Sequence, residues 1–175
     1  MILSGDEIDI ARKRGELVIE PFFTEQLNPN SYNFRLAPKI IEIAPNVESP
    51  SERLLEAEGF LLLPGHLYLG CTAEIIGSTR YVTTLLGRSS MGRLGLFLNI
   101  TADLGHCGAI SQWTLEMAVV QPLRIYAGMP IGQVAFWVQH GDANHYVGRY
   151  QRDLGPQLNK DRPLTAELSN DLKRQ

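Results

Sequence analysis

The sequence has 175 residues, a length typical of one domain and sufficient to enclose a sizeable hydrophobic core. Hydrophobic residues make up 44% of the chain and charged residues 20%, a composition that excludes an intrinsically disordered protein. The formal net charge of -3 excludes a general electrostatic attraction to nucleic acid or to an anionic membrane, so any anion site has to be local.

The N-terminus and the cysteines indicate a cytoplasmic protein. Residues 1–17 carry acidic side chains where a signal peptide would carry an apolar stretch. No apolar run approaches the ~20 residues that a membrane-spanning helix needs. Cys71 and Cys107 match no metal-ligand spacing. We expect two free thiols, and a single disulfide is the alternative.

The first predicted element is a short helix over residues 5–14. Ser4 stands where an N-cap is expected, Glu7 follows it at capping-box spacing, and Gly15 is a natural helix end. The segment LVIEPFF that follows predicts a strand interrupted by Pro21.

From there to about residue 140 the pattern is that of an all-β protein. Short runs rich in β-branched and aromatic residues are separated by Gly, Pro and Asn, among them YNFRL, KIIEI, LYLGCTAEII, YVTTLLG and IGQVAFWV. Regularly spaced short strands with turn residues predict a β-sandwich, a barrel or a jelly roll. Residues 44–58 are polar, and we expect a surface loop there.

Residues 141–163 are polar, punctuated by Gly and Pro, and hold two tyrosines and four cations. Their composition is compatible with a solvated tail or with a flap that closes over a ligand. We expect a single domain over residues 1–163, with residues 141–163 as its closing tail. Residues 164–175 would be a C-terminal extension, either a terminal helix around Thr165 or a frayed end.

The stretch GRSSMGRLG, residues 87–95, concentrates hydrogen-bond donors in an apolar setting. Arg88 and Arg93 carry planar guanidinium groups suited to phosphate oxygens, and Ser89 and Ser90 add hydroxyl groups. The stretch is not a Walker A loop, because no Gly-Lys-Ser/Thr follows a four-residue gap. We expect a phosphate site here, and a turn with solvated arginines is the alternative.

Glu116 lies among apolar residues in QWTLEMAVV. Strand alternation places residues 114, 116 and 118 on one face and residues 113, 115 and 117 on the other. A solvated strand face is the structural alternative, whereas a partly buried carboxylate is the usual general base for activating water. His106 and Cys107 would suggest zinc, but the His-x-Glu and Pro-Cys-x-x-Cys motifs of zinc deaminases are absent, so we expect no zinc.

Several motifs together resemble one family. MILSGDEI, QLNPNSYNFRL, LLPGHLYLGCTAEII, GRSSMGRLGL, WTLE, GMPIGQVAF and GRYQRDLGP follow, from Met1 to about Lys160, the order and spacing of the dCTP deaminase branch of the dCTP deaminase/dUTPase superfamily. The resemblance implies a mainly β, distorted jelly roll (a β-clip of the dUTPase type) with a short N-terminal helix. It also implies a homotrimer with active sites at subunit interfaces and a nucleoside triphosphate as the partner.

The resemblance implies metal-independent hydrolytic deamination of a cytosine nucleotide, by default dCTP and water giving dUTP and ammonia. Glu116 would deprotonate the water that attacks C4 of cytosine, and the Ser89 hydroxyl and the Ala102 backbone would hold that water. Arg88, Ser89, Ser90 and Arg93 would bind the triphosphate, which would carry Mg²⁺, with Ser89 and Arg93 also close to the base. The other implied nucleotide contacts are Thr114, Gln133, Tyr146, Arg149 and Tyr150.

The sequence departs from the family pattern at three places. Gly105-His106 stand where the family usually has Ile-Asp, whose aspartate contacts the deoxyribose 3′-hydroxyl, and Asp103 would have to substitute for it. Ser111 replaces a usual glycine, and Asp153 replaces a tail glutamine. The sequence therefore leaves open whether the substrate carries another sugar or a modified base. A dUTPase-like or bifunctional diphosphatase, and a non-catalytic nucleotide-binding trimer, are the alternative functions.

Overall fold

The computed structural model describes residues 1–44, 50–98, 102–142, 144–148 and 154–160. No helix in these ranges is long and apolar enough to cross a membrane. The expected contacts Arg149 and Tyr150, the replaced position Asp153 and the extension 164–175 lie outside the described residues.

The predicted N-terminal helix is confirmed as α1 (Gly5–Lys13). The Ser4 hydroxyl accepts a hydrogen bond from the backbone N–H of Glu7 at 3.3 Å, so it satisfies a donor that a helix start leaves unpaired. The chain leaves the helix through Gly15, whose φ of 71° is easily adopted only by glycine. Ile8 and Ala11 are fully buried and fasten the helix to the core.

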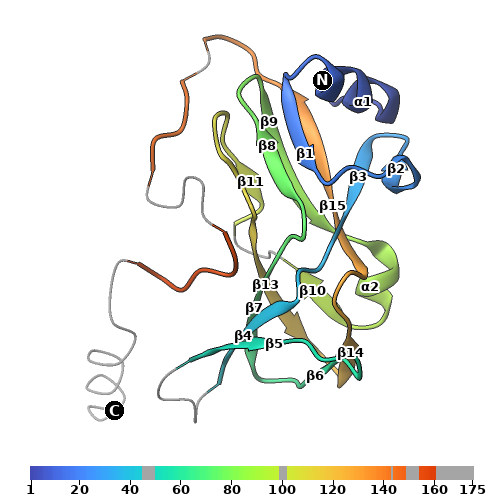
Figure 1. Cartoon of the computed structure of the whole chain (residues 1–175), viewed down its shortest axis with the longest axis vertical. Coiled ribbons are helices and arrows are strands. Elements are labelled where there is room, and N and C mark those ends of the chain that lie inside the picture. Colours follow the sequence, from blue (N-terminus) through green and yellow to red (C-terminus); the bar gives the residue numbers. More distant parts are fainter. Residues whose placement is uncertain (45–49, 99–101, 143, 149–153, 161–175) are drawn as a thin grey trace.

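The rest of the described chain is mainly β, as expected, with every paired strand antiparallel (Figure 1). One five-stranded sheet has the order β10 (Leu96–Leu98), β13 (Thr114–Val119), β7 (Leu67–Cys71), β4 (Lys39–Ile43) and β5 (Glu52–Leu54). A second has the order β11 (Leu104–Gly105), β9 (Tyr81–Gly87), β15 (Pro130–Val138), β3 (Ser31–Arg35) and β2 (Leu27–Asn28).

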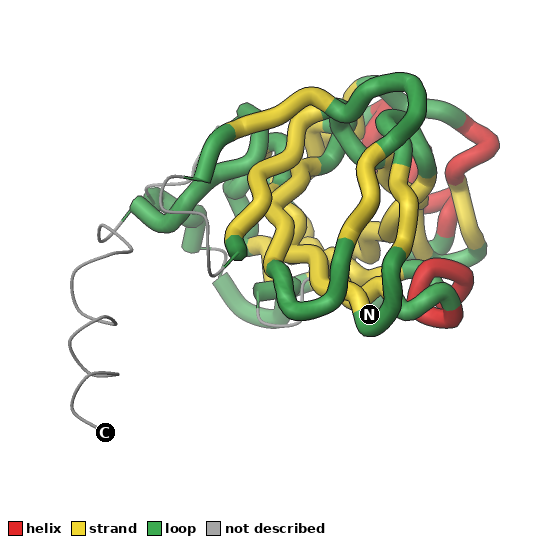
Figure 2. Tube along the Cα trace, turned by 90° about the horizontal axis from the view of Figure 1, so that it is seen from below, coloured by secondary structure: helices red, strands yellow, loops and turns green. Residues whose placement is uncertain are grey.

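Smaller elements complete the fold. A three-stranded sheet has the order β1 (Leu17–Glu20), β8 (Ile75–Ser78) and β12 (Ile110–Ser111), and β14 (Leu123–Ile125) pairs with β6 (Phe60–Leu62). The short helices are η1 (Thr24–Gln26) and α2 (Ser89–Arg93). Figure 2 shows the strands around the interior and the helices on one side of them.

The interior is filled by aliphatic and aromatic side chains, and its largest fully buried members include Tyr32, Phe34, Tyr68 and Phe136. The hydroxyl groups of the two fully buried tyrosines are paired. Tyr32 accepts a hydrogen bond from the backbone of Phe23 at 3.0 Å, and Tyr68 accepts one from that of Leu63 at 2.9 Å. The core therefore leaves neither phenol oxygen without a partner, as buried tyrosines require.

One expectation about a loop was wrong in part. Within the expected loop 44–58, residues Glu52–Leu54 form β5, the edge strand of its sheet, which pairs with β4. All three residues are exposed, because an edge strand is held by its backbone pairing and needs no apolar side chains. In the candidate phosphate stretch, residues Ser89–Arg93 form the short helix α2, whose Met91 is buried in the core.

Candidate active site

Glu116 lies in the middle of β13, where the predicted alternation is confirmed. Leu115 and Met117 are fully buried, and Glu116, between them, is half-buried and paired with Leu69 of β7. Trp113 was expected on the opposite face but lines the same cavity as Glu116. The strand begins only at Thr114, so the alternation does not extend to Trp113, whose indole donates to the Ile76 carbonyl at 2.8 Å.

Glu116 lines a cavity of about 650 Å³. Much of the wall is apolar, and its aliphatic members include Ile43, Leu67, Leu69, Leu104 and Leu158. Glu116 is the only carboxylate among the described lining residues, and none of the described residues donates a hydrogen bond to it or forms an ion pair with it. A carboxylate in such a place has its oxygens available for water or for a ligand.

His106 and Tyr146 form an aromatic part of the cavity wall. Their rings stack with centroids 5.6 Å apart and an interplanar angle of 22°. The backbone N–H of Tyr146 donates to the Cys107 carbonyl at 2.8 Å. Gly108, at φ 92°, leaves room for His145, because a Cβ at position 108 would lie only 3.1 Å from the Cβ of His145. These contacts hold residues 144–148 against the turn that carries His106.

Residues 154–160 contact the body of the protein beside the same cavity. The Gly155 N–H donates to Gln112 Oε1 at 2.9 Å, and the Gln157 N–H donates to Thr114 Oγ1 at 3.0 Å. Gly155 and Pro156 are buried, and Gln157, Leu158 and Asn159 line the cavity. This part of the C-terminal segment therefore supplies a wall of the cavity that contains Glu116.

The candidate phosphate-binding turn lies at the end of β9. Arg88 precedes α2, and its Nη1 donates to the Pro130 carbonyl at 3.2 Å. Ser89, Ser90 and Arg93 on α2 are exposed. Four groups able to bind an anion are thus grouped on one short segment, three of them at the surface.

Gln133 supports this turn from the neighbouring strand β15. Its Oε1 accepts from the Ser31 hydroxyl at 2.7 Å, and its Nε2 donates to the carbonyl of Gly87, the residue before Arg88, at 3.2 Å.

The expected site residues therefore form two groups. The described residues that line the cavity include Ala102, His106, Thr114, Glu116 and Tyr146. The residues of the turn and its support, which do not line it, are Arg88, Ser89, Ser90, Arg93 and Gln133. Asp103 is exposed and belongs to neither group. In Figure 1, α2 and residues 154–160, drawn in red, lie on opposite sides of the molecule.

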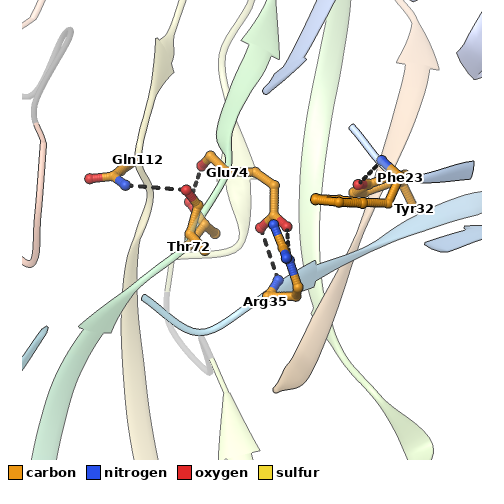
Figure 3. Close-up of polar contacts among 7 residues, drawn as sticks. Phe23, Tyr32, Arg35, Thr72, Glu74 and Gln112 are labelled. Atoms are coloured by element: carbon orange, nitrogen blue, oxygen red, sulfur yellow. Dashed lines mark hydrogen bonds and ion pairs between the residues drawn. The ribbon is translucent and has the colours of Figure 1, made fainter. Parts of the chain in front are cut away.

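No sequence pattern singled out Glu74, the most deeply buried carboxylate of the described chain, with 0% exposure. Its two oxygens accept hydrogen bonds from the Arg35 backbone N–H at 2.9 Å and from Arg35 Nε at 2.7 Å (Figure 3). The Arg35 guanidinium lies 4.2 Å from the centre of the Phe23 ring. The residues around Glu74, CTAEII, are as apolar as those around Glu116. The two glutamates are distinguished in the structure by Arg35, which approaches Glu74 from another strand.

The described residues contain no group of three or more His, Cys, Asp or Glu side chains that could hold a metal ion. Cys71 and Cys107 are free and buried, as expected. Burial raises the pKa of Cys71 to about 12 and also raises the pKa of Cys107. Neither thiol is therefore available as a thiolate nucleophile near neutral pH.

Comparison with known proteins agrees with the motifs. A family model described as dCTP deaminase-like matches residues 2–138. A protein of Hathewaya histolytica named "dCTP deaminase, dUMP-forming" is 44% identical over 164 residues, which cover 90% of this chain and 95% of that protein. A protein of the same name from Cytophaga hutchinsonii is 43% identical over 167 residues, covering 90% and 94%.

Among solved structures, the 2′-deoxycytidine 5′-triphosphate deaminase of Agrobacterium tumefaciens superposes with a TM-score of 0.66 at 21% identity. The match covers 79% of this chain and 48% of that one, so this chain spans about half its length, and the likeness concerns the fold alone. The family model and these relatives together place the protein among hydrolytic enzymes. The chain belongs to the dCTP deaminase-like family, which confirms the resemblance.

Proposed function

We propose that this protein deaminates dCTP and releases dUMP, in the balance dCTP + 2 H₂O → dUMP + NH₃ + diphosphate. The observation that carries the proposal is the lone carboxylate of Glu116 in a largely apolar cavity, within a chain of the dCTP deaminase-like family. The motifs alone made dUTP the default product. We propose dUMP because the relatives that cover nearly the whole chain are named dUMP-forming.

In this mechanism Glu116 acts as the general base. Its carboxylate accepts a proton from a water molecule, the water oxygen forms a bond to C4 of cytosine, and the C4–N4 bond then breaks. Glu116 passes this proton to N3, then takes the remaining proton from the C4 hydroxyl and gives it to the departing nitrogen, so that ammonia leaves and C4 becomes the carbonyl of uracil. The absence of a described partner on Glu116 supports this role, because an ion pair would compete with water for the carboxylate.

The phosphates would be bound by Arg88, Ser89, Ser90 and Arg93, whose cations and hydroxyl groups suit phosphate oxygens better than they suit a metal ion. We therefore propose that Mg²⁺ arrives with the nucleotide, held by its triphosphate. The positive charges of the turn and the ion would together neutralise the triphosphate and its diphosphate leaving group.

We propose further that each complete site forms between two copies of a homotrimer. The turn and the cavity are separate groups on one chain, so one copy's Arg93 would meet the neighbouring copy's cavity. An apolar sheet face supports such an assembly. On it Leu86, Leu104 and Trp137 are 39%, 55% and 40% exposed, and their strand neighbours in β9 and β15 place them on the same side.

The proposed reaction is tested by incubating the purified chain with dCTP and Mg²⁺ and measuring ammonia and diphosphate in the same sample. Equal amounts of both products, with dUMP as the nucleotide, are expected. Ammonia alone would restrict the enzyme to forming dUTP. Neither product, with dCTP still bound, would contradict the proposal and favour a nucleotide-binding protein.

The shared site is tested by mixing two variants, Arg93→Ala and Glu116→Gln, after dissociation and reassembly, at dCTP well below KM, where each variant alone should keep about a tenth of the wild-type activity or less. A random trimer pairs an intact turn with an intact cavity at about a quarter of its interfaces, so about a quarter of the wild-type activity should return. A mixture that stays inactive although the variants co-assemble would show that both groups must come from one chain.

A further inference from the structure

We infer that Gln112 is a positioning residue. It docks residues 154–160 of its own chain, here called the C-terminal segment, beside Glu116. The inference rests on the proposed function for its kinetic readout only. Gln112 stands two residues before β13, which begins at Thr114. It contacts the segment from the body of the protein, through a hydrogen bond that no motif predicted.

The side-chain amide of Gln112 makes two hydrogen bonds in opposite directions. Its Nε2 donates to the Ala73 carbonyl at 3.3 Å, and its Oε1 accepts from the Gly155 N–H at 2.9 Å. Because an amide has one donating and one accepting end, the bond to Ala73 orients Oε1 toward the C-terminal segment. Gln112 therefore joins the segment to the connection between β7 and β8.

That connection is itself fixed (Figure 3). Thr72 Oγ1 donates to the Glu74 carbonyl at 2.7 Å, and the Glu74 carboxylate is held by Arg35. The Ala73 N–H donates to the Arg35 carbonyl at 2.7 Å. The carbonyl that orients Gln112 thus belongs to a segment with little freedom to move, which is what a positioning contact needs.

The docked segment changes the cavity. Gln157, Leu158 and Asn159 line it together with Trp113 and Glu116. Gly155 is held at φ 81°, and the Gln157 side chain donates back to the Leu154 and Gly155 carbonyls at 3.1 and 3.3 Å, which gives the segment a fixed turn. The bond to Gln112 sets where this turn lies and hence how closely the segment covers the cavity.

The test compares Gln112→Met with Gln112→Glu in the full chain. Methionine keeps the length of the side chain but removes both hydrogen bonds, whereas glutamate keeps an acceptor for the Gly155 N–H. Gln121→Met is the matched control. The Gln121 amide also donates to a backbone carbonyl, that of Leu94 at 3.1 Å, but lies beyond the other end of β13 and does not line the cavity.

Docking is read from Trp113, which lines the cavity. The chain has two tryptophans, so Trp137→Phe leaves Trp113 as the only one. In that background, acrylamide should quench the fluorescence of Trp113 at least about twofold more strongly in Gln112→Met than in the parent. The reason is that an undocked segment leaves the cavity exposed to solvent. Gln112→Glu should fall between Gln112→Met and the parent, and Gln121→Met should equal the parent.

The kinetic readout uses dCTP. Loss of one neutral hydrogen bond at the segment should raise KM about three- to tenfold, with kcat changed less than KM. The inference would be overturned if Gln112→Met changed neither the quenching of Trp113 nor KM. It would also be overturned if acrylamide quenched Trp113 equally in Gln112→Met and Gln112→Glu. If the wild type releases no ammonia, the proposed function fails, and the quenching experiment still decides the role of Gln112.

Discussion

Glu74 and Glu116 are both glutamates in apolar, strand-rich segments of the sequence, yet the fold treats them differently. Glu74 is fully buried, and both of its oxygens accept hydrogen bonds from Arg35. Glu116 is half-buried beside a cavity, and no described residue pairs with it. A buried charge has to be paired to be tolerated, whereas an unpaired carboxylate at a cavity can exchange protons with a ligand. Glu74 therefore supports the fold, and Glu116 is the residue proposed for chemistry.

The largest effect that separates the two is expected from Glu116→Gln. The amide has nearly the shape of the acid but cannot accept the proton from water, so dCTP turnover should fall by about 10²–10⁴-fold. The free energy of unfolding should change by less than about 0.5 kcal/mol, because no described partner of Glu116 is lost. Turnover and urea unfolding measured on one preparation test this, and an active variant would contradict the role of Glu116.

Glu74→Gln should show the opposite profile. Removing the negative charge leaves the Arg35 guanidinium, whose side chain is only 23% exposed, without its counter-charge. The free energy of unfolding should therefore fall by about 2–4 kcal/mol. Turnover per folded molecule should stay within a fewfold of wild type. A stable variant that has lost its activity would mean that the two glutamates have been assigned the wrong roles.

A second buried ionisable group, the thiol of Cys71, can be tested through the pH dependence of stability. The thiol has its ordinary pKa of 9.0 in the unfolded chain, whereas burial raises the pKa in the folded protein to about 12. The folded state then keeps a proton that the unfolded state loses. Stability is therefore complete below about pH 9 and falls by about 1.4 kcal/mol per pH unit as the pH rises toward 12.

Cys71→Ala removes this component, so its unfolding free energy should fall less steeply above pH 9 than that of the wild type. The difference in slope is the quantity to measure, because the substitution also changes the packing at every pH. Identical slopes would contradict the assignment, since they would mean that the Cys71 thiol ionises equally in the two states.

The phosphate end of the site contrasts with both glutamates, because its charges are at the surface. Arg93→Ala should raise KM for dCTP about 10–100-fold, as expected for the loss of charge-assisted hydrogen bonds. Binding of deoxycytidine, which has no phosphate, should change about twofold at most. Equal losses for nucleotide and nucleoside in titration calorimetry would remove Arg93 from the phosphate site.

The smallest effect concerns a carboxylate at the surface. Hydrogen bonds from Lys13 and then Arg12 lower the pKa of Asp9, and the pairs measure 2.6 and 2.8 Å. A lowered pKa gives stability that is present above the unfolded pKa near 3.9 and is lost as the pH falls through the folded pKa. Asp9→Asn should cost a few tenths of a kcal/mol at about pH 7 and nothing near pH 2. A cost that persists near pH 2 would assign it to the helix rather than to the charge.

Local sequence patterns predicted α1, the strand-rich body and the inward and outward residues of β13, because each depends on neighbours in the chain. They did not predict β5 or the position of Trp113, since pairing with β4 and the start of β13 at Thr114 decide these. They also could not distinguish Glu74 from Glu116. The distinguishing partner, Arg35, lies 39 residues from Glu74 and is brought to it only by the fold.

The candidate site was predictable residue by residue but not as an arrangement. The motifs named both groups, but only the three-dimensional structure shows that Glu116 shares a cavity with His106 and Tyr146, while Arg93 does not line it. Gln112 was not predicted because a glutamine before a strand carries no signal of its own. Its role depends on Ala73 and Gly155, which are distant in sequence.

The most direct test of the central claim is ammonia release from saturating dCTP by the wild type and by Glu116→Gln, with dCTP binding confirmed for both by calorimetry. We predict one ammonia per dCTP consumed by the wild type, and a variant that binds dCTP but releases ammonia at least about 10²-fold more slowly. Ammonia released at the wild-type rate by Glu116→Gln would contradict the account.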